Sequence, residues 1–373
     1  MPARLVLSTL ALLCVAATPT WKTQEIDTSL QIGYGVVVVD VNDDEKPDIV
    51  VADKERVIWF ENPTWKLGTI TQGTTKPDNV SIAPHDIDGD GKVDFALAAG
   101  WQPGNTKEPS TLQWLRRGKS LDEPWEMLPI KYDEPTLHRI RWDDNKLVTV
   151  PLMGRGSTKE KNWSEAGVKI HAFAVPTDPT KPDWTSKTLT DAFRVAHNFF
   201  PTPAGILVAS YEGAHLLKPD GSIAKMGEGD QSNPDGNRGA SEIKQGKLTD
   251  GGTFVATIEP WHGHQVVVYE NRARHIVDDQ LRWGHAISCA DLDGDGGDEI
   301  IAGVRDPLPG KTKPGVRVYG RKSGVDWERT DIDGGGVAVE DLAIADLNGD
   351  GKPDIVAVGR QTKNVRIYWN QRP

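Results

Sequence analysis

One acidic pattern recurs four times along the chain and constrains the fold more than any other feature. It reads DVNDDEKPDIVVA from Asp40, HDIDGDGKVDFALAAG from His85, DLDGDGGDEIIAG from Asp291 and DLNGDGKPDIVAV from Asp346. In each copy, alternating apolar residues precede an acidic turn and an apolar run follows it, which predicts a strand, a turn and a second strand. A repeated unit of this kind favours a repeat architecture.

Two further repeats follow the acidic turns, or the equivalent positions of units that lack them. Seven short segments, from VIWFENP to VRIYWNQ, have the pattern of a strand that ends in polar or turn residues. A tryptophan then opens a fourth segment, at Trp65, Trp125, Trp184 and Trp327. Seven units of four strands fit the chain. The length that remains after the predicted signal, divided by seven, is about 51 residues, close to the repeat length of a four-stranded propeller blade.

The last unit ends at VRIYWNQRP without a fourth strand. Near the start of the chain, WKTQEI from Trp21 matches the missing segment. We therefore predict an all-β, seven-bladed β-propeller in which the N-terminal strand completes the last blade, because this closure removes a free sheet edge. A pair of β-sandwiches is the alternative, and it does not explain the exchanged strand.

The first residues have the three parts of a secretory signal: a positive residue, Arg4, then an apolar run, then small residues. We predict a signal peptide over residues 1–17, a propeller over residues 18–373, and a secreted or periplasmic location. A lipoprotein anchored at Cys14 is the alternative, although Leu13 stands where a small residue would be expected.

Composition excludes several classes of partner. The formal net charge is −11, which opposes attraction to nucleic acid or to anionic lipid. No apolar run after the signal reaches the roughly 20 residues that a membrane-spanning helix needs. Of the two cysteines, Cys14 lies in the signal, so Cys289 has no intramolecular partner for a disulfide.

The acidic turns predict calcium sites. Calcium takes roughly six to eight oxygen ligands and tolerates irregular geometry, so oxygens at positions 1, 3, 5 and 9 of a glycine-containing turn suit it. In the first turn Asp43 and Glu45 replace the glycines. Tight turns that use Asp and Gly for backbone reasons alone are the alternative, but clustered carboxylates repel each other without a cation. The predicted structural calcium ligands are Asp40, Asn42, Asp44, Asp48, Asp86, Asp88, Asp90, Asp94, Asp291, Asp293, Asp295, Glu299, Asp346, Asn348, Asp350 and Asp354.

The other connections of the blades bring polar side chains to the opposite face of the ring. Blade-entry segments and second-to-third loops emerge on that face, and they carry five of the nine histidines. The polar and aromatic residues of these segments are His138, Arg155, Arg194, His197, Tyr211, Glu212, Arg238, Glu242, Glu259, Trp261, His262, His264, Arg282, His285, Arg305, Asp306, Glu340 and Asp341.

Histidines that converge on this mouth predict a zinc site. A catalytic zinc takes three protein ligands, often imidazole nitrogens, and keeps one position open. The predicted ligands are His197, His262 and His285, with His138 and His264 as alternatives. Any one of these histidines alone is more simply a strand-end residue with local hydrogen bonds, but their spacing from blade to blade favours a group.

The acidic turns resemble those of the FG-GAP or VCBS family of secreted seven-bladed propellers. The resemblance covers nearly all of the mature chain, although the units that begin near Pro135, Arg194 and Asn233 lack the turn. Together with HDIDGDG, RWGHAISCADLDGDGGDE and the histidine-lined mouth, the chain also resembles the propeller domain of the aldos-2-ulose dehydratase family, without room for the cupin domains of its fungal members. This second resemblance implies a zinc-dependent lyase that acts on keto-sugars such as 1,5-anhydrofructose.

The implied lyase reaction would give roles to the other residues of the mouth. Zinc would polarise the ketone, and a histidine or a carboxylate would remove the neighbouring proton while a β-hydroxyl departs as water. Arginine and tyrosine would bind sugar oxygens or stabilise the developing negative charge, and a tryptophan would stack on the ring. The predicted catalytic residues are His138 or Glu340 as the base, with Arg305 and Tyr211, and the predicted substrate-binding residues are Trp261, Arg155 and Glu212.

A non-catalytic propeller is the competing interpretation. It would bind a glycan or a protein at the polar mouth, with calcium only stabilising the fold, since function depends on the site rather than on the fold. A quinone-cofactor sugar dehydrogenase on the same fold is a third alternative, for which no feature of the sequence demands the cofactor.

Overall fold

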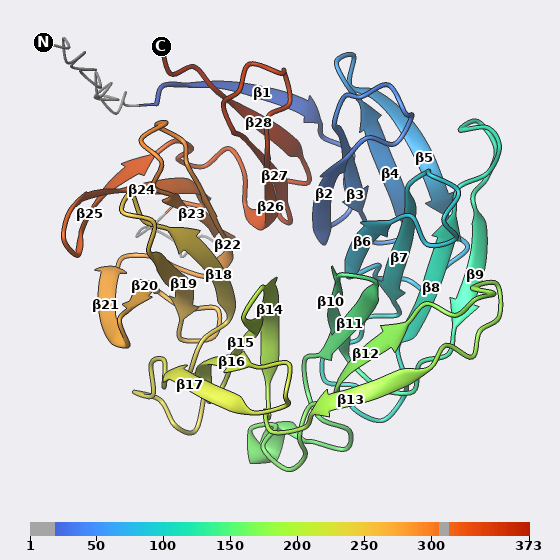
Figure 1. Cartoon of the computed structure of the whole chain (residues 1–373), viewed down its shortest axis with the longest axis horizontal. Helices are drawn as coiled ribbons and strands as arrows, with labels where there is room; N and C mark the ends of the chain where they lie inside the picture. Colours follow the sequence, from blue (N-terminus) through green and yellow to red (C-terminus); the bar gives the residue numbers. More distant parts are fainter. Residues whose placement is uncertain (1–18, 306–312) are drawn as a thin grey trace, which may run out of the picture.

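Seven antiparallel sheets, each of four strands, surround a central axis (Figure 1). They are seen in a computed structural model that describes residues 19–305 and 313–373. The predicted signal peptide and the mouth residue Asp306 lie outside the described residues. The seven-bladed all-β propeller predicted from the repeats is confirmed.

Six blades each take four consecutive strands, and the first strand of each blade lies nearest the axis (Figure 1). Blades 1 to 3 are β2 (Gly35–Val39), β3 (Asp48–Ala52), β4 (Arg56–Glu61) and β5 (Lys66–Gln72); β6 (Ser81–His85), β7 (Asp94–Ala99), β8 (Thr111–Arg116) and β9 (Glu126–Ile130); and β10 (Leu137–Asp143), β11 (Lys146–Pro151), β12 (Ile170–Ala174) and β13 (Ser186–Thr190). Blades 4 to 6 are β14 (Ala196–Thr202), β15 (Gly205–Ser210), β16 (Gly213–Leu217) and β17 (Ile223–Gly227); β18 (Glu242–Lys247), β19 (Thr253–Glu259), β20 (Gln265–Glu270) and β21 (Ala273–Asp278); and β22 (Gly284–Ala290), β23 (Glu299–Val304), β24 (Gly315–Ser323) and β25 (Asp326–Asp331).

Blade 7 closes the ring with a strand from each end of the chain. It contains β26 (Val339–Ala345), β27 (Asp354–Gly359) and β28 (Val365–Asn370), and its outermost strand is β1 (Trp21–Asp27). The two terminal strands pair antiparallel, with Trp21 opposite Asn370. The predicted exchange of the N-terminal strand is therefore confirmed.

The position of a strand in its blade explains its burial. Second strands such as β7 are buried along their whole length, because the adjacent blades cover both of their faces. Fourth strands such as β25 face solvent and are largely exposed. The core consequently lies between blades: Ile49 and Phe60 of blade 1 pack with Val356 and Ile367 of blade 7.

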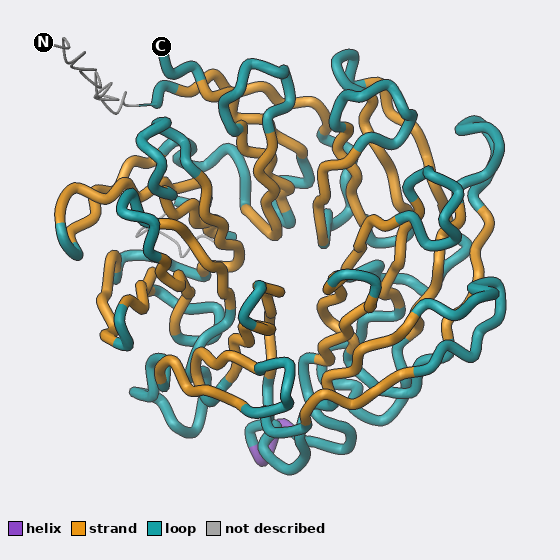
Figure 2. Tube along the Cα trace, in the orientation of Figure 1, coloured by secondary structure: helices purple, strands orange, loops and turns teal. Residues whose placement is uncertain are grey.

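Strands and connecting loops make up nearly all of the described chain (Figure 2). One short 3-10 turn, Lys159–Lys161, lies between β11 and β12. No helix in the described ranges is long and apolar enough to cross a membrane. The acidic turns join first to second strands at one face of the ring, and the second-to-third loops and blade-entry segments lie at the other, as the repeat pattern predicts.

Candidate metal centre

The same irregularity occurs in the first strand of four blades. In β10, β14, β22 and β26 the pairing register shifts by one residue near the strand start, which leaves one residue of the first strand without a partner. A β-bulge of this kind re-aims a side chain, and bulges are common beside active sites. The residues at the four bulges are His138, His197, His285 and Glu340.

Two of these bulged residues meet a histidine from a loop. One ring nitrogen from each of His197, His262 and His285 lies within 4.8 Å of the other two, and Nε2 of His262 is 3.0 Å from Nε2 of His197. His262 comes from the loop between β19 and β20, whereas the other two come from first strands. The structure therefore brings together the three residues predicted as zinc ligands.

Backbone acceptors orient the two bulged histidines. Nδ1 of His285 lies 2.6 Å from the carbonyl oxygen of Glu340, and Nδ1 of His197 lies 3.1 Å from that of Ser241. Donation from Nδ1 leaves the lone pair on Nε2, the tautomer that a metal requires. Burial, together with the charges of Arg139 and Arg305, holds the pKa of both imidazoles well below the ordinary value, so they stay neutral. The pKa of His262 is likewise held well below its ordinary value by burial, so three neutral imidazoles, two of them with fixed outer hydrogen bonds, fit a three-ligand zinc site.

A tight loop positions His262. The backbone N–H of His264 donates to the carbonyl oxygen of Glu259, and a Cβ on Gly263 would lie only 2.1 Å from that oxygen, so the close approach requires glycine. His262 itself has φ +50, a left-handed conformation, and its ring stacks on Trp261 at 4.2 Å. The Glu259 carboxylate, fully buried, accepts hydrogen bonds from Tyr269 and Arg274, which anchor the start of the loop.

Charged groups surround the histidines. The Glu340 carboxylate is buried and accepts from Arg305 at 3.3 Å and from Arg360 at 2.9 Å. Burial raises the pKa of Glu340, although both arginines oppose the rise. On the other side, an oxygen of Glu242 lies 2.8 Å from Nδ1 of His197.

The two alternative histidines lie outside this group. The ring of His138 packs 4.5 Å from that of His197, with Nδ1 bonded to the His197 carbonyl oxygen and Nε2 facing Arg139 at 3.3 Å. His264 follows His262 by two residues, and none of its ring nitrogens joins the cluster in the described part of the chain.

The predicted sugar-binding residues separate into two sets. Tyr211 and Trp261 pack edge to face at 6.2 Å beside His262, so they border the candidate centre. Arg155 instead donates to the carbonyl oxygens of Lys107 and Asp133, in loops of blades 2 and 3. The Glu212 carboxylate accepts a long hydrogen bond, 3.4 Å, from the backbone N–H of Arg194 in its own blade.

The acidic turns share one backbone arrangement on the other face. The carboxylate of the first position binds loop amides, as Asp86 does with Gly89 and Gly91. Carboxylates of the first, third and fifth positions lie within 4.8 Å of one another in the turns at Asp86 and Asp291. In the first turn Asp43 and Glu45 adopt the positive φ that glycine has elsewhere.

The ninth position of each turn is buried and tied to backbone amides. Asp94, for example, accepts from the N–H groups of Ile87 and Arg117. Burial raises the pKa of Asp48, Asp94 and Asp354 to about 6, and it raises that of Glu299 to about 8. These raised values show that the turns hold negative charge at a cost, which a bound cation would offset.

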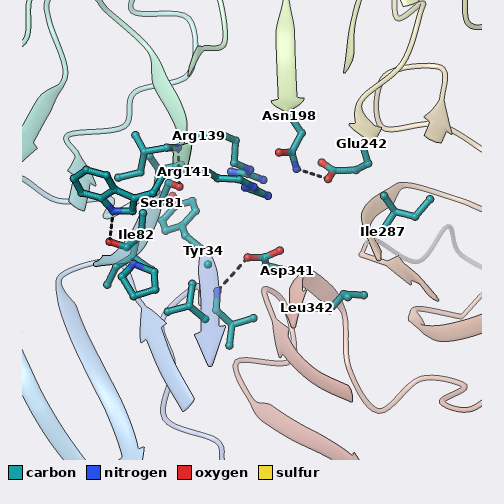
Figure 3. Close-up of a pocket in the computed structure, with 18 of the residues that line it drawn as sticks. Tyr34, Ser81, Ile82, Arg139, Arg141, Asn198, Glu242, Ile287, Asp341 and Leu342 are labelled. Atoms are coloured by element: carbon teal, nitrogen blue, oxygen red, sulfur yellow. Dashed lines mark hydrogen bonds between the residues drawn. The ribbon is translucent and has the colours of Figure 1, made fainter. Parts of the chain in front are cut away.

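Sequence reasoning missed three cationic residues that face the central axis. Arg139 and Arg141 from β10 line a cavity of about 330 Å³ among the first strands (Figure 3). Lys244 from β18 lines the same cavity. Their spacing in the sequence held a signal, because Arg139 and Arg141 alternate along one strand and Lys244 follows Glu242 by two residues, so each pair shares a strand face.

Comparison with known proteins agrees with this architecture. Residues 40–97, from the first acidic turn to the second strand of blade 2, match the FG-GAP-like repeat. Among solved structures, the WD40 β-propeller domain of Doa1 is similar at 11% identity and a TM-score of 0.58, covering 94% of this chain and 97% of that one. The PQQ-bound aldose sugar dehydrogenase of Streptomyces coelicolor is similar at 12% identity and a TM-score of 0.50, covering 94% and 98%. At these identities the likeness concerns the fold.

One curated relative is a lyase. The chain is a distant homologue of aldos-2-ulose dehydratase from Phanerodontia chrysosporium, with 26% identity over 250 residues. The matched region covers 56% of this chain and only 27% of the relative.

Proposed function

We propose that the chain is an exported, zinc-dependent lyase that removes water from a keto-sugar such as 1,5-anhydrofructose. The observation that carries the proposal is the cluster of His197, His262 and His285, whose geometry fits a zinc site with one open position. The distant homology to a sugar dehydratase supports the choice of reaction. Export itself remains a prediction from the first 17 residues.

The three histidines would hold the metal through their inner nitrogens. A zinc ion there supplies a Lewis acid that polarises a ketone and acidifies the adjacent C–H bond. The carbonyl oxygens of Ser241 and Glu340 hold His197 and His285 in the required orientation. Trp261, stacked on His262, offers an aromatic face beside the cluster for a sugar ring.

Glu340 is the stronger of the two predicted bases. Its pKa is raised by burial, so the carboxylate has a greater affinity for a proton than an exposed one. Nε2 of His138 already faces the Arg139 guanidinium, and burial keeps the pKa of that imidazole well below its ordinary value. We assign proton removal to Glu340 and a positioning role, through the His197 carbonyl, to His138.

The elimination balances with these groups. The Glu340 carboxylate takes the proton as the C–H bond breaks and a C=C bond forms. The β-hydroxyl leaves as its C–O bond breaks and takes that proton from Glu340 to become water, which restores the carboxylate. The guanidinium of Arg305, already bonded to Glu340, places positive charge beside the developing negative charge. Burial raises the pKa of Tyr211, so its hydroxyl stays protonated and can donate to a sugar oxygen.

Metal analysis of the purified mature chain, dialysed against calcium-containing and zinc-free buffer, is the first test. The proposal predicts about one zinc per chain and formation of an ultraviolet-absorbing product from 1,5-anhydrofructose. His262→Ala should lose both zinc and turnover, whereas His275→Ala, on the outer strand β21, should keep both. Calcium without zinc, and no turnover, would favour the non-catalytic binding propeller.

Glu340→Gln separates the base from the metal. It should retain zinc and lower kcat by about 10²- to 10⁴-fold, the usual contribution of a general base. His138→Gln should have a smaller effect on kcat. A reversed order of the two variants would show that His138 is the base.

A further inference from the structure

A polar cavity of about 330 Å³ lies on the axis, among the first strands of several blades. It adjoins the candidate metal centre through two of its lining residues: Arg139 contacts His138, and Glu242 lies against His197. Figure 3 shows the side chains of Arg139 and Arg141 reaching into it from the same strand, opposite Asn198 and Glu242.

Three basic side chains in this cavity make no ion pair with a carboxylate among the described residues, although Glu242 and Asp341 attract Arg141 and Lys244 at longer range. Arg141 makes no hydrogen bond or ion pair within the described ranges, and its guanidinium lies 5.6 Å from the ring of Phe199. The Lys244 ammonium lies 4.9 Å from the ring of Phe200 and likewise has no acidic group within 4 Å in the part of the chain that the structure describes. Among the residues that the structure describes, Arg139 donates to the carbonyl oxygen and ring of His138 alone.

Each of the two carboxylates that line the cavity has one oxygen in a hydrogen bond, and the second oxygen of Glu242 is buried without a hydrogen bond among the described residues. Glu242 accepts a hydrogen bond from the Asn198 amide, and its other oxygen faces the His197 ring. Asp341 accepts from the backbone N–H of Val36 at 3.1 Å. Three basic side chains therefore face two carboxylates, and positive charges withdrawn from water at such short range repel one another.

We propose that this cavity binds an oxyanion, a carboxylate or an inorganic tetrahedral anion, through Arg139, Arg141 and Lys244. Guanidinium groups form two-pronged hydrogen bonds with such oxygens, and an ammonium adds a point charge. The anion can be a free ion or the acid group of a sugar. In the second case the inference rests on the proposed function and makes its substrate an acidic sugar.

The test is calorimetric titration of the mature chain, in low-salt, calcium-containing buffer, with sodium sulfate, sodium D-glucuronate and D-glucose. We expect sulfate or glucuronate to bind and glucose not to bind. Equal affinity for the two anions would identify a free-anion site, and tighter binding of glucuronate would identify an acidic sugar. Binding of neither anion would overturn the proposal.

Variants tie the binding to the cavity. Arg141→Gln should weaken anion binding by at least about tenfold, the effect of losing one charged hydrogen bond, whereas Arg272→Gln, an exposed turn residue, should bind as wild type. Without anion, Arg141→Gln should have a Tm equal to or above that of wild type, because it removes a cation that Arg139 repels and that makes no ion pair among the described residues. Unchanged affinity in Arg141→Gln would overturn the proposal.

Zinc measured on the same samples distinguishes the two proposals. Anion binding without zinc would leave the cavity site standing and count against the lyase. Zinc without anion binding would overturn only the cavity site.

Discussion

Replacement of Gly263 by alanine tests whether the loop geometry sets the metal centre. The added Cβ would lie 2.1 Å from the carbonyl oxygen of Glu259, and real Cβ atoms stay at least 3.0 Å from such an atom, so the two must separate by about 0.9 Å (3.0 minus 2.1). The contacted atoms belong to the backbone and cannot swing away. Gly263 also accepts a hydrogen bond from the N–H of Gly284, next to His285. The shift should therefore reach two of the three histidines.

A shift of this size exceeds what a metal site tolerates. Ligand distances are held to roughly 0.2 Å, and changes to the groups that orient ligands typically cost about 10- to 100-fold in metal affinity. We expect Gly263→Ala to lose zinc affinity by that factor. Overpacking of this loop should also cost the fold about 1 to 3 kcal/mol, too little to unfold it.

Competition against a chromogenic zinc chelator gives the affinity, and circular dichroism gives the Tm. Gly320→Ala in β24 is the matched control, because the described residues leave the position of its Cβ open. An affinity for Gly263→Ala within threefold of the control would refute the argument that this close approach positions His262.

Three further predictions concern stability. Asn370→Ala removes a buried amide that donates to the Leu292 carbonyl oxygen of the neighbouring blade at 2.8 Å. The free energy of unfolding, measured in urea, should fall by about 1 to 3 kcal/mol. A loss no larger than that of the exposed Asn145→Ala would contradict the role of this bond. Burial lowers the pKa of Lys244 to about 7, so the folded state binds fewer protons than the unfolded state between pH 7 and 10.5. The free energy of unfolding of the wild type should therefore rise with pH in that range more steeply than that of Lys244→Met. Equal pH dependence in the two proteins would contradict this. Chelation of calcium should lower the Tm more at pH 8 than at pH 5. The pKa of Asp94 is raised to about 6, so the metal-free folded state takes up protons and becomes more stable as the pH falls. An equal loss of Tm at both pH values would contradict this.

The fold could be predicted because strong local sequence patterns mark its repeats. Acidic turns with glycine at the positive-φ positions mark the first hairpin of four blades, and Trp21 reproduces the signature of a fourth strand. These signals depend on residues close in sequence. Closure of the ring then follows from the count of strands alone.

The metal centre could be predicted only in part. Topology sends blade-entry segments and second-to-third loops to one mouth, which was sufficient to propose His197, His262 and His285. Each bulge inserts one unpaired residue into the first strand, and the alternation of apolar and polar residues in the sequence does not show where that residue falls. The sequence also did not show that Arg155 would donate hydrogen bonds to carbonyl oxygens of loops distant in the sequence.

The missed cations illustrate a second difficulty. Alternating charges on a strand usually indicate a solvent-facing side, and Arg139 with Arg141 has that appearance. In a propeller the open side of the first strand faces the axis, where polar and charged residues line a cavity. Only the assembled ring distinguishes the two surroundings.

The pairing of β1 with β28 also determines the order of events in folding. Trp21 and its partner Asn370 are 349 positions apart (370 minus 21), so β1 cannot pair until β28 has been synthesised. Until they meet, blade 7 has an open edge that can recruit a strand from another molecule. Contacts this distant in sequence form slowly. A longer interval before closure therefore leaves this edge exposed to aggregation and proteolysis for longer.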